Sequence, residues 1–196
     1  MSHHTNGHST HPATLDVIAG PMFSNKSLEL IGRIRRVQYA KKKTLCFYPE
    51  TDTRTEHETI GSRSLSKPEP AIACKSARDI LQHITPNIAA VGIDEAQFWD
   101  MEEPELLGLV CLELVRKHGI NVKVAGLDLD ASDKPFEVVA FLMAIADRVT
   151  KTRAVCVQCG SEYGSRSQRL VKTNARTLVG DADAYEARCT HCFEPH

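Results

Sequence analysis

The chain has 196 residues, of which 42% are hydrophobic and 25% are charged. This length suits one large domain, or one domain with a small appendage, and the composition provides an ordinary apolar core. The formal net charge of −1 gives no indication of a general polyanion-binding surface, so nucleic acid is not an implied partner. No apolar run approaches the roughly 18 residues of a membrane-spanning helix, so no membrane partner is expected.

The N-terminal segment, residues 1–13, contains four histidines and has no apolar core of the kind found in secretory signals. We expect a disordered, His-rich leader. Weak metal binding by His3, His4, His8 and His11 is the alternative. A chain without a signal segment is expected to be cytoplasmic.

The first chemical motif is GPMFSNKS, residues 20–27, between an apolar run at 15–19 and a helix-like stretch at 28–40. A strand, a loop and a helix in this order form a phosphate-binding P-loop, in which backbone N–H groups and the helix N-terminus face the anion. A chance surface turn is the alternative. The residues expected to bind ATP and Mg²⁺ are Gly20, Pro21, Met22, Phe23, Ser24, Asn25, Lys26 and Ser27.

Three positions of this loop decide its chemistry. Lys26 reaches the outer phosphates, and the Ser27 hydroxyl can hold Mg²⁺. Asn25 stands where the G-x-x-x-x-G-K-[ST] pattern has its second glycine. Because asparagine tolerates a positive φ better than other residues with a side chain, we expect the loop to keep its shape.

Apolar runs alternate with helical patterns through residue 150, which is typical of a parallel sheet covered by helices on both faces. The sequence therefore predicts an α/β fold. Ligands of such sheets bind beyond the carboxyl ends of the strands, where Gly20, Asp94 and Asp128 fall. We expect strands at 15–19, 44–48, 88–93 and 122–127, and helices at 26–40, 76–83, 104–118 and 138–147.

The ends of two predicted strands carry acidic residues. Asp94 and Glu95 follow the strand at 88–93; beside a P-loop, such an Asp can bind the Mg²⁺ complex and the next carboxylate can accept a proton. An acidic cap of the strand is the alternative. Asp52 and Arg54 follow the second strand and offer a further carboxylate and guanidinium to phosphate and metal, unless they form a solvated turn. They open a polar stretch that is either a plain surface loop or a functional one.

The seven cysteines are an odd number, which argues against a disulfide framework. Cys46, Cys74 and Cys111 lie in apolar stretches and are expected in the core. The other four form two C-x₂-C pairs and predict a closed, tetrahedral Zn²⁺ site. These predicted ligands are Cys156, Cys159, Cys189 and Cys192. Redox dithiols, or His191 in place of one cysteine, are alternatives. The pairs are 29 residues apart, so the metal would hold the base of a long loop.

The sequence resembles a type II thymidine kinase, closest to the bacterial branch, over residues 15–192. The resemblance is carried by GPMFSNKSLELIGRIRR, DTR at 52–54, DEAQFWD at 94–100, GLDLD at 126–130 and the tail CVQCG…YEARCTHC. It implies a P-loop ATP-binding domain over 14–153 and a zinc-anchored lasso subdomain over 154–196 that closes over a nucleoside. It also implies transfer of the ATP γ-phosphate to the 5′-hydroxyl of thymidine or deoxyuridine, usually by a homotetramer.

The resemblance also implies roles for individual residues. Glu95 would be the base that takes the proton of the 5′-hydroxyl. Outside the P-loop, the residues expected to contact ATP or Mg²⁺ are Asp52, Arg54, Asp94, Glu95, Ala96 and Gln97. The residues expected to contact the nucleoside are Met22, Phe98, Ser167 and Tyr185.

Three positions depart from the family pattern. Asn25 replaces a glycine, Trp99 replaces a phenylalanine, and residues 130–132 lack the aromatic that commonly lies near the thymine. Met143 and Trp99 are the candidates to supply the lost stacking area.

Two other classes of function compete with a thymidine kinase. One is a non-catalytic or regulatory nucleotide-binding homologue with a degenerate P-loop, which the retention of Lys26, Ser27 and Glu95 disfavours. The other is a zinc-knuckle protein that binds nucleic acid, which the lack of basic excess disfavours.

Overall fold

A computed structural model describes residues 12–51, 59–60, 67–171 and 182–195. Asp52, Arg54 and most of the His-rich leader therefore lie outside the described residues. None of the helices in the described ranges combines the length and the apolar character needed to cross a membrane.

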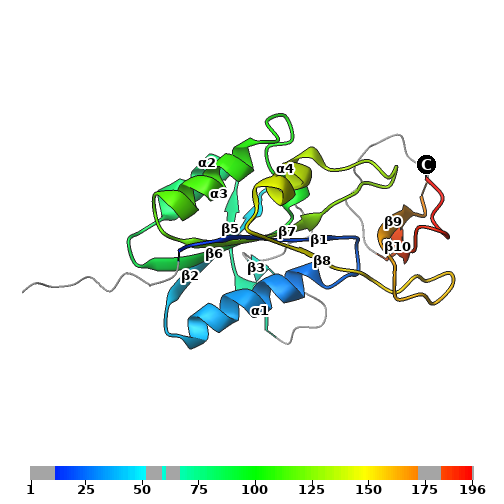
Figure 1. Ribbon diagram of the computed structural model, residues 1–196, viewed down its shortest axis with the longest axis horizontal. Helices are drawn as coiled ribbons and strands as arrows, with labels where there is room; N and C mark the ends of the chain where they lie inside the picture. The colour runs from blue at the N-terminus through cyan, green and yellow to red at the C-terminus, as the bar shows by residue number, and fades with distance from the viewer. Residues whose placement is uncertain (1–11, 52–58, 61–66, 172–181, 196) are drawn as a thin grey trace, which may run out of the picture.

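Helices and strands alternate along the chain (Figure 1). In chain order they are β1 (Leu15–Gly20), α1 (Lys26–Tyr39), β2 (Lys43–Pro49), β3 (Thr59–Ile60), β4 (Glu69–Pro70), β5 (Ile72–Cys74), α2 (Ala77–Ile80), the 3₁₀ helix η1 (Leu81–His83), β6 (Ile88–Ile93), the 3₁₀ helix η2 (Ala96–Phe98), α3 (Leu106–Arg116), β7 (Asn121–Leu127), α4 (Glu137–Ile145), β8 (Arg148–Lys151), β9 (Arg166–Arg169) and β10 (Tyr185–Arg188).

Six strands form the central sheet in the order β5-β2-β6-β7-β1-β8, and every pairing between them is parallel. Helix α1 covers one face, and α2, α3 and α4 cover the other (Figure 1). The strands β9 and β10 form a separate antiparallel pair beyond the carboxyl end of β1 (Figure 1). The predicted α/β fold, a parallel sheet flanked by helices with a small cysteine-bearing subdomain, is confirmed.

The sheet has an apolar layer on each face because its inner strands are mostly apolar on both sides, apart from the ion pair between Asp16 of β1 and Lys123 of β7 at 2.8 Å. Successive residues of β1 show this alternation. Val17 packs in the larger core under α3 and α4, whereas Ile18 packs with Ile31 and Ile34 of α1. Ile18 therefore packs against α1, the helix that begins at the end of the P-loop.

The structure differs from the sequence prediction at the edges of the sheet. Neither β5 nor β8 was predicted: β5 has three residues, and β8 has the sequence RVTK with Val149 exposed by 40%. The segment predicted as one helix at 76–83 is α2 followed by η1, and α3 is shorter at both ends than the predicted 104–118.

The three unpaired cysteines behave as core residues, as predicted. Cys46, Cys74 and Cys111 are all buried. Burial raises the pKa of Cys46 and Cys111 to about 12 and that of Cys74 to about 11. These thiols therefore stay protonated and inert near neutral pH.

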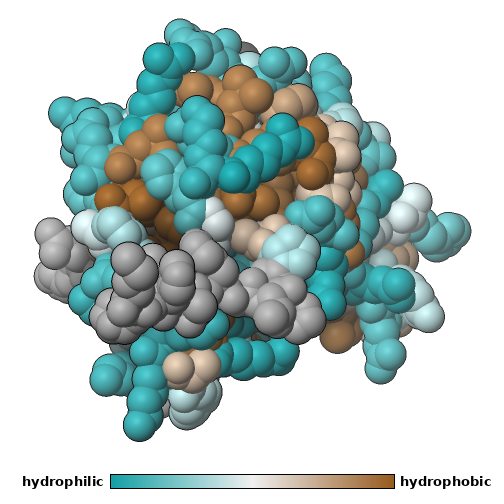
Figure 2. Space-filling view, turned by 60° about the vertical axis from the view of Figure 1, so that its left-hand side comes forward, coloured by the Kyte–Doolittle hydropathy of each residue, from teal (hydrophilic) through white to brown (hydrophobic). Residues whose placement is uncertain are grey.

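The surface carries an apolar area surrounded by hydrophilic residues, in the half of the molecule that holds α2 and α3 (Figure 2). Leu109 of α3 and Met101, which precedes that helix, are exposed by 53% and 55%. Apolar areas on a protein surface are candidates for contact with another protein.

Candidate active site

The P-loop connects β1 to α1 through two residues in the left-handed region. Phe23 has φ 63°, and Asn25 has φ 61° and ψ 28°. The prediction that asparagine supports a positive φ at this position is confirmed. The Asn25 carbonyl accepts the first helical hydrogen bond, from the N–H of Glu29 at 3.0 Å. Lys26 Nζ donates to the Pro21 carbonyl at 2.6 Å, across the loop.

Thr152, which directly follows β8, is hydrogen-bonded to the P-loop and to the end of β1. Its hydroxyl lies 2.7 Å from that of Ser24, and its N–H donates to the Ala19 carbonyl at 2.8 Å. The Ser24 hydroxyl donates to the Pro21 carbonyl at 2.7 Å. A Cβ at Gly20 would lie 2.4 Å from Thr152 Oγ1, so the close approach requires glycine. Sequence reasoning missed Thr152 because nothing near it in the chain indicates the contact.

Asp94, the carboxylate predicted to bind Mg²⁺, lies next to Ser27, the P-loop residue that is also predicted to bind Mg²⁺. Asp94 is 5% exposed and is hydrogen-bonded to the Ser27 side chain. Burial, and then the charge of Glu95, raise the pKa of Asp94 to about 7, while Ser27 and the Lys26 charge act in the opposite direction. Mg²⁺ binds oxygen ligands, and a hydroxyl next to a carboxylate provides two of them.

The predicted base, Glu95, has an unusual backbone. Its φ of 50° and ψ of 45° lie in the left-handed region. Its N–H donates to Asp94 Oδ1 at 2.9 Å, and its carbonyl accepts from the N–H of Phe98 at 3.0 Å. The Glu95 side chain is half-buried, next in sequence to the buried Asp94.

Two residues predicted to contact ATP turn their side chains into the protein. Ala96 is 1% exposed and Gln97 is 0% exposed. The Gln97 amide donates to Glu95 Oε2 at 2.5 Å and accepts from the N–H of Leu127 at 2.9 Å. Any contact of these two residues with a nucleotide would therefore come from their backbone.

The lasso meets the P-loop directly. The N–H of Met22 donates to the Ser167 hydroxyl of β9 at 3.0 Å. Met22 also packs against a small cluster formed by Ala131, Ala184 and Tyr185. Three of the four residues predicted to contact a nucleoside are thereby brought together around Met22.

The fourth predicted nucleoside contact, Phe98, is half-buried in η2, the turn that carries the Gln97 side chain inward. Trp99 packs in the main core, 1% exposed, and its Nε1 donates to the Asp94 carbonyl at 3.0 Å. Met143 also packs against that core. Neither Trp99 nor Met143 therefore belongs to the Ala131 cluster, where the two residues were expected to replace the missing aromatic.

The loop between β7 and α4 is tied to the lasso by charge. Asp130 is buried, and its Oδ1 accepts from the N–H groups of Ser132 and Lys134 at 2.9 and 3.0 Å. Asp133, at the tip of this turn, forms an ion pair with Arg166 of β9. The hydrogen bonds of Asp130 shape the turn itself, and the ion pair of Asp133 joins this turn to the lasso. Neither was predicted.

The four paired cysteines come together as predicted. Their sulfur atoms, on Cys156, Cys159, Cys189 and Cys192, all lie within 4.8 Å of one another. The sulfurs of Cys159 and Cys189 are 3.8 Å apart. A tetrahedral zinc with Zn–S distances of about 2.3 Å separates its sulfurs by roughly 3.8 Å. The arrangement thus fits a Zn²⁺ ion, and the exposed His191 is not part of this cluster.

The backbone around the first cysteine pair favours the thiolate form of Cys156 and makes a tight turn. The N–H of Cys189 lowers the pKa of Cys156 to about 6. Gly160 follows the first pair with φ 74°, and its N–H donates to the Cys156 carbonyl at 2.9 Å. The N–H of Val157 donates to the Ala187 carbonyl at 2.9 Å, which joins the first pair to β10.

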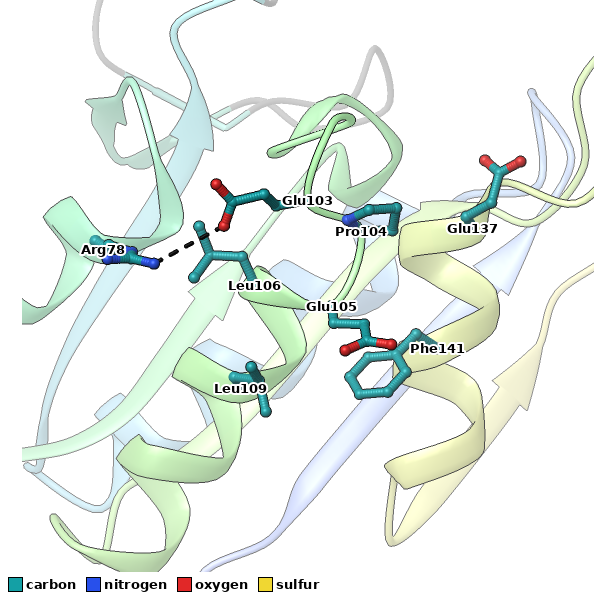
Figure 3. Close-up of a pocket in the computed structure, with 8 residues that line it drawn as sticks. All are labelled: Arg78, Glu103, Pro104, Glu105, Leu106, Leu109, Glu137 and Phe141. Carbon is teal, nitrogen blue, oxygen red and sulfur yellow. Dashed lines mark ion pairs between the residues drawn. The ribbon is translucent and has the colours of Figure 1, made fainter.

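A cavity of about 520 Å³ lies apart from these groups, between the N-terminal ends of α3 and α4 (Figure 3). Leu109 and Phe141 supply apolar side chains to its lining, and Arg78, which also lines it, pairs with Glu103 at 3.8 Å (Figure 3). No P-loop residue and neither member of the acidic pair lines it. It is therefore not the phosphate site.

A parallel sheet with this loop on β1 and an acidic pair at the end of β6 defines a P-loop nucleotide-binding protein. The sequence matches the family described as thymidine kinase over residues 13–193. The match spans the P-loop, the acidic pair and all four paired cysteines. The chain belongs to the thymidine kinase family.

Proposed function

We propose that the protein transfers the γ-phosphate of ATP to the 5′-hydroxyl of a deoxynucleoside, thymidine or deoxyuridine, in nucleotide salvage. Family membership supports a kinase. The observation that carries the proposal is a continuous set of contacts from Ser27 through Asp94 to Glu95, with Ser167 of the lasso on the Met22 N–H. These contacts gather the residues expected for phosphate, metal, base and nucleoside.

The P-loop residues would hold the phosphates through backbone N–H groups and the Lys26 ammonium. Ser27 and Asp94 would hold Mg²⁺, which neutralises phosphate charge when it is bound. Glu95 would accept the proton of the 5′-hydroxyl, because a primary hydroxyl is a poor nucleophile at neutral pH. Most of the rate enhancement would come from alignment and charge stabilisation around the γ-phosphate. Asp52 and Arg54 are proposed to assist, although they lie outside the described residues.

The nucleoside would lie against Met22, Phe98, Ser167 and Tyr185. Ala131 takes the place of an aromatic in this cluster, and base stacking on an aromatic is worth roughly 1–3 kcal/mol. Nucleoside affinity is therefore expected to depend on hydrogen bonds from the lasso. Fixed backbone donors and acceptors reject analogues that leave them unpaired.

Zinc on the four paired cysteines is proposed to be structural. A metal that closes a long loop can hold its shape without a large apolar core. We place the boundary between the ATP-binding domain and the lasso subdomain after residue 153. Two observations support this boundary: β8, just before it, pairs with β1 of the central sheet, and Ala154, just after it, forms a β-bridge with Gly164. We also propose a homotetramer and a cytoplasmic location, which sedimentation and fractionation would test.

The direct test is a radiometric assay with ATP, Mg²⁺ and a panel of deoxynucleosides. Phosphorylation of thymidine or deoxyuridine is the expected result. ATP binding without transfer to any nucleoside would favour the non-catalytic homologue instead. Salt-dependent binding of single-stranded DNA would favour a nucleic-acid-binding protein.

A further inference from the structure

Gln97 is a fully buried polar side chain at the bottom of the acidic turn, with both ends of its amide engaged. Its oxygen accepts from the N–H of Leu127, the last residue of β7, and its nitrogen donates to the Glu95 carboxylate. A backbone N–H can only donate, so the amide oxygen must face Leu127. The amide nitrogen is then left facing Glu95, and the orientation of the amide is determined by its partners.

The residue that receives this hydrogen bond is held in a costly backbone conformation. A residue with a side chain pays about 1–2 kcal/mol in the left-handed region occupied by Glu95. Such conformations persist where the surrounding contacts over-determine them. Asp94 and Phe98 hold the Glu95 backbone, and Gln97 holds its carboxylate.

The turn is also pressed against β7. A Cβ at Gly126 would lie 2.8 Å from the Ala96 Cβ and 3.2 Å from Gln97 Oε1. The position of the turn relative to the sheet is therefore set by close packing, and Gln97 transmits that position to Glu95 through its two hydrogen bonds.

We infer that Gln97 is a positioning residue, whose amide aims the Glu95 carboxylate at the acceptor hydroxyl, and that its side chain does not contact the nucleotide. The inference rests on the proposed function, because it takes Glu95 as the base. Misplacement of a reacting group by about 1 Å can cost on the order of 10²-fold in rate. The effect of Gln97 should therefore appear in kcat and only through Glu95.

The kinetic test is a double-mutant cycle with Gln97→Met and Glu95→Gln. Methionine keeps the length of glutamine and removes both hydrogen-bonding ends. Gln97→Met is expected to lower kcat about 10–100-fold and to leave KM for ATP within about threefold. In the Glu95→Gln background it should cost no more than about threefold, because the two residues act as one unit. An equal loss in both backgrounds, or no loss in the first, would overturn the inference.

Trp99→Phe is the matched structural control. It removes a different hydrogen bond of the same turn, from Nε1 to the Asp94 carbonyl, without touching the Glu95 carboxylate. Its effects on thermal stability and kcat are expected to be the same in the wild-type and Glu95→Gln backgrounds. Strong coupling of Trp99→Phe to Glu95 would mean that the cycle reports a general loosening of the turn, which would also overturn the inference.

An NMR measurement tests the hydrogen bond between Gln97 and Glu95 independently of enzymatic activity. In ¹⁵N-labelled protein, the side-chain amide signal of Gln97, assigned by its loss in Gln97→Met, is expected downfield and slow to exchange with solvent. Glu95→Gln should move this signal, and Trp99→Phe should not. If the wild-type chain phosphorylates no nucleoside, the proposed function fails while this spectrum still tests the contact. If the Gln97 side-chain signal has the same chemical shift in Glu95→Gln as in the wild type, the inference is overturned.

Discussion

Substituting Asn25 by glycine and by alanine separates what the P-loop backbone requires from what the side chain contributes. Asn25 has φ 61° and makes no side-chain cap to α1. Alanine in this region costs about 1–2 kcal/mol, whereas glycine adopts it freely. For a chain of this size, 1 kcal/mol shifts Tm by roughly 2–4 °C. Asn25→Ala is therefore expected to lower Tm by about 2–8 °C.

Glycine should behave differently in stability and in ATP binding. Its greater freedom in the unfolded chain costs about 0.4–1 kcal/mol, which offsets the relief of backbone strain. The Tm of Asn25→Gly should then stay within about 3 °C of wild type. Removal of the Cβ and amide beside the phosphates should tighten ATP binding. A gain of about 1 kcal/mol corresponds to roughly fivefold in affinity.

Thermal unfolding and steady-state kinetics, with ATP and nucleoside varied in turn, measure both effects. kcat/KM for ATP should rise in Asn25→Gly, while KM for the nucleoside stays nearly unchanged because Met22 and Phe98 are untouched. Weaker ATP binding in Asn25→Gly would refute the reasoning and would make Asn25 an adapted phosphate contact. If activity is absent in the wild-type chain and appears in Asn25→Gly, the non-catalytic hypothesis is correct.

Three further substitutions test the proposed site. Glu95→Gln should lower kcat by roughly 10²–10⁴-fold while equilibrium binding of ATP and nucleoside is retained; an unchanged kcat would remove Glu95 from the mechanism. Cys156→Ser should release the one Zn²⁺ expected per chain and raise KM for the nucleoside far more than KM for ATP, whereas metal analysis that finds no zinc in freshly purified wild-type protein would contradict the zinc site. Asp94→Asn should raise the Tm of the metal-free protein at pH 8 and change it much less at pH 5. The reason is that the raised pKa of Asp94, about 7, makes its contribution to stability disappear as pH rises through that value. Equal Tm values for Asp94→Asn and wild type at pH 8 would show that the buried charge is not costly.

The inner strand β6 could be predicted because burial on both faces leaves a continuous apolar run, and β1 departs from such a run only at Asp16. The strand β6 has the predicted bounds, and β1 differs from its prediction by one residue. The edge strand β8 could not be predicted in this way. Among the described residues, one of its sides has no neighbouring strand, and its sequence RVTK needs no apolar pattern.

The P-loop could be predicted because its chemistry is contained in eight consecutive residues. The contacts that support it are not local. Thr152 meets Ser24 across 128 positions, and Gln97 meets Leu127 across 30. The family resemblance places Gln97 among the ATP contacts but could not show that its side chain is buried, because a motif shows which residues occur together and not which way each side chain turns.

The position of β1 in the sheet has a consequence for the synthesis of the protein. This strand is made first, yet both of its neighbours, β7 and β8, are encoded more than 100 residues later. A ribosome adding about 5–20 residues per second needs on the order of ten seconds to reach Lys151. Until then the apolar β1 segment of the nascent chain has no strand to pair with. A ribosome that stalls before β8 would thus release a chain that carries the whole P-loop motif but cannot build the loop, and that exposes an aggregation-prone strand to chaperones.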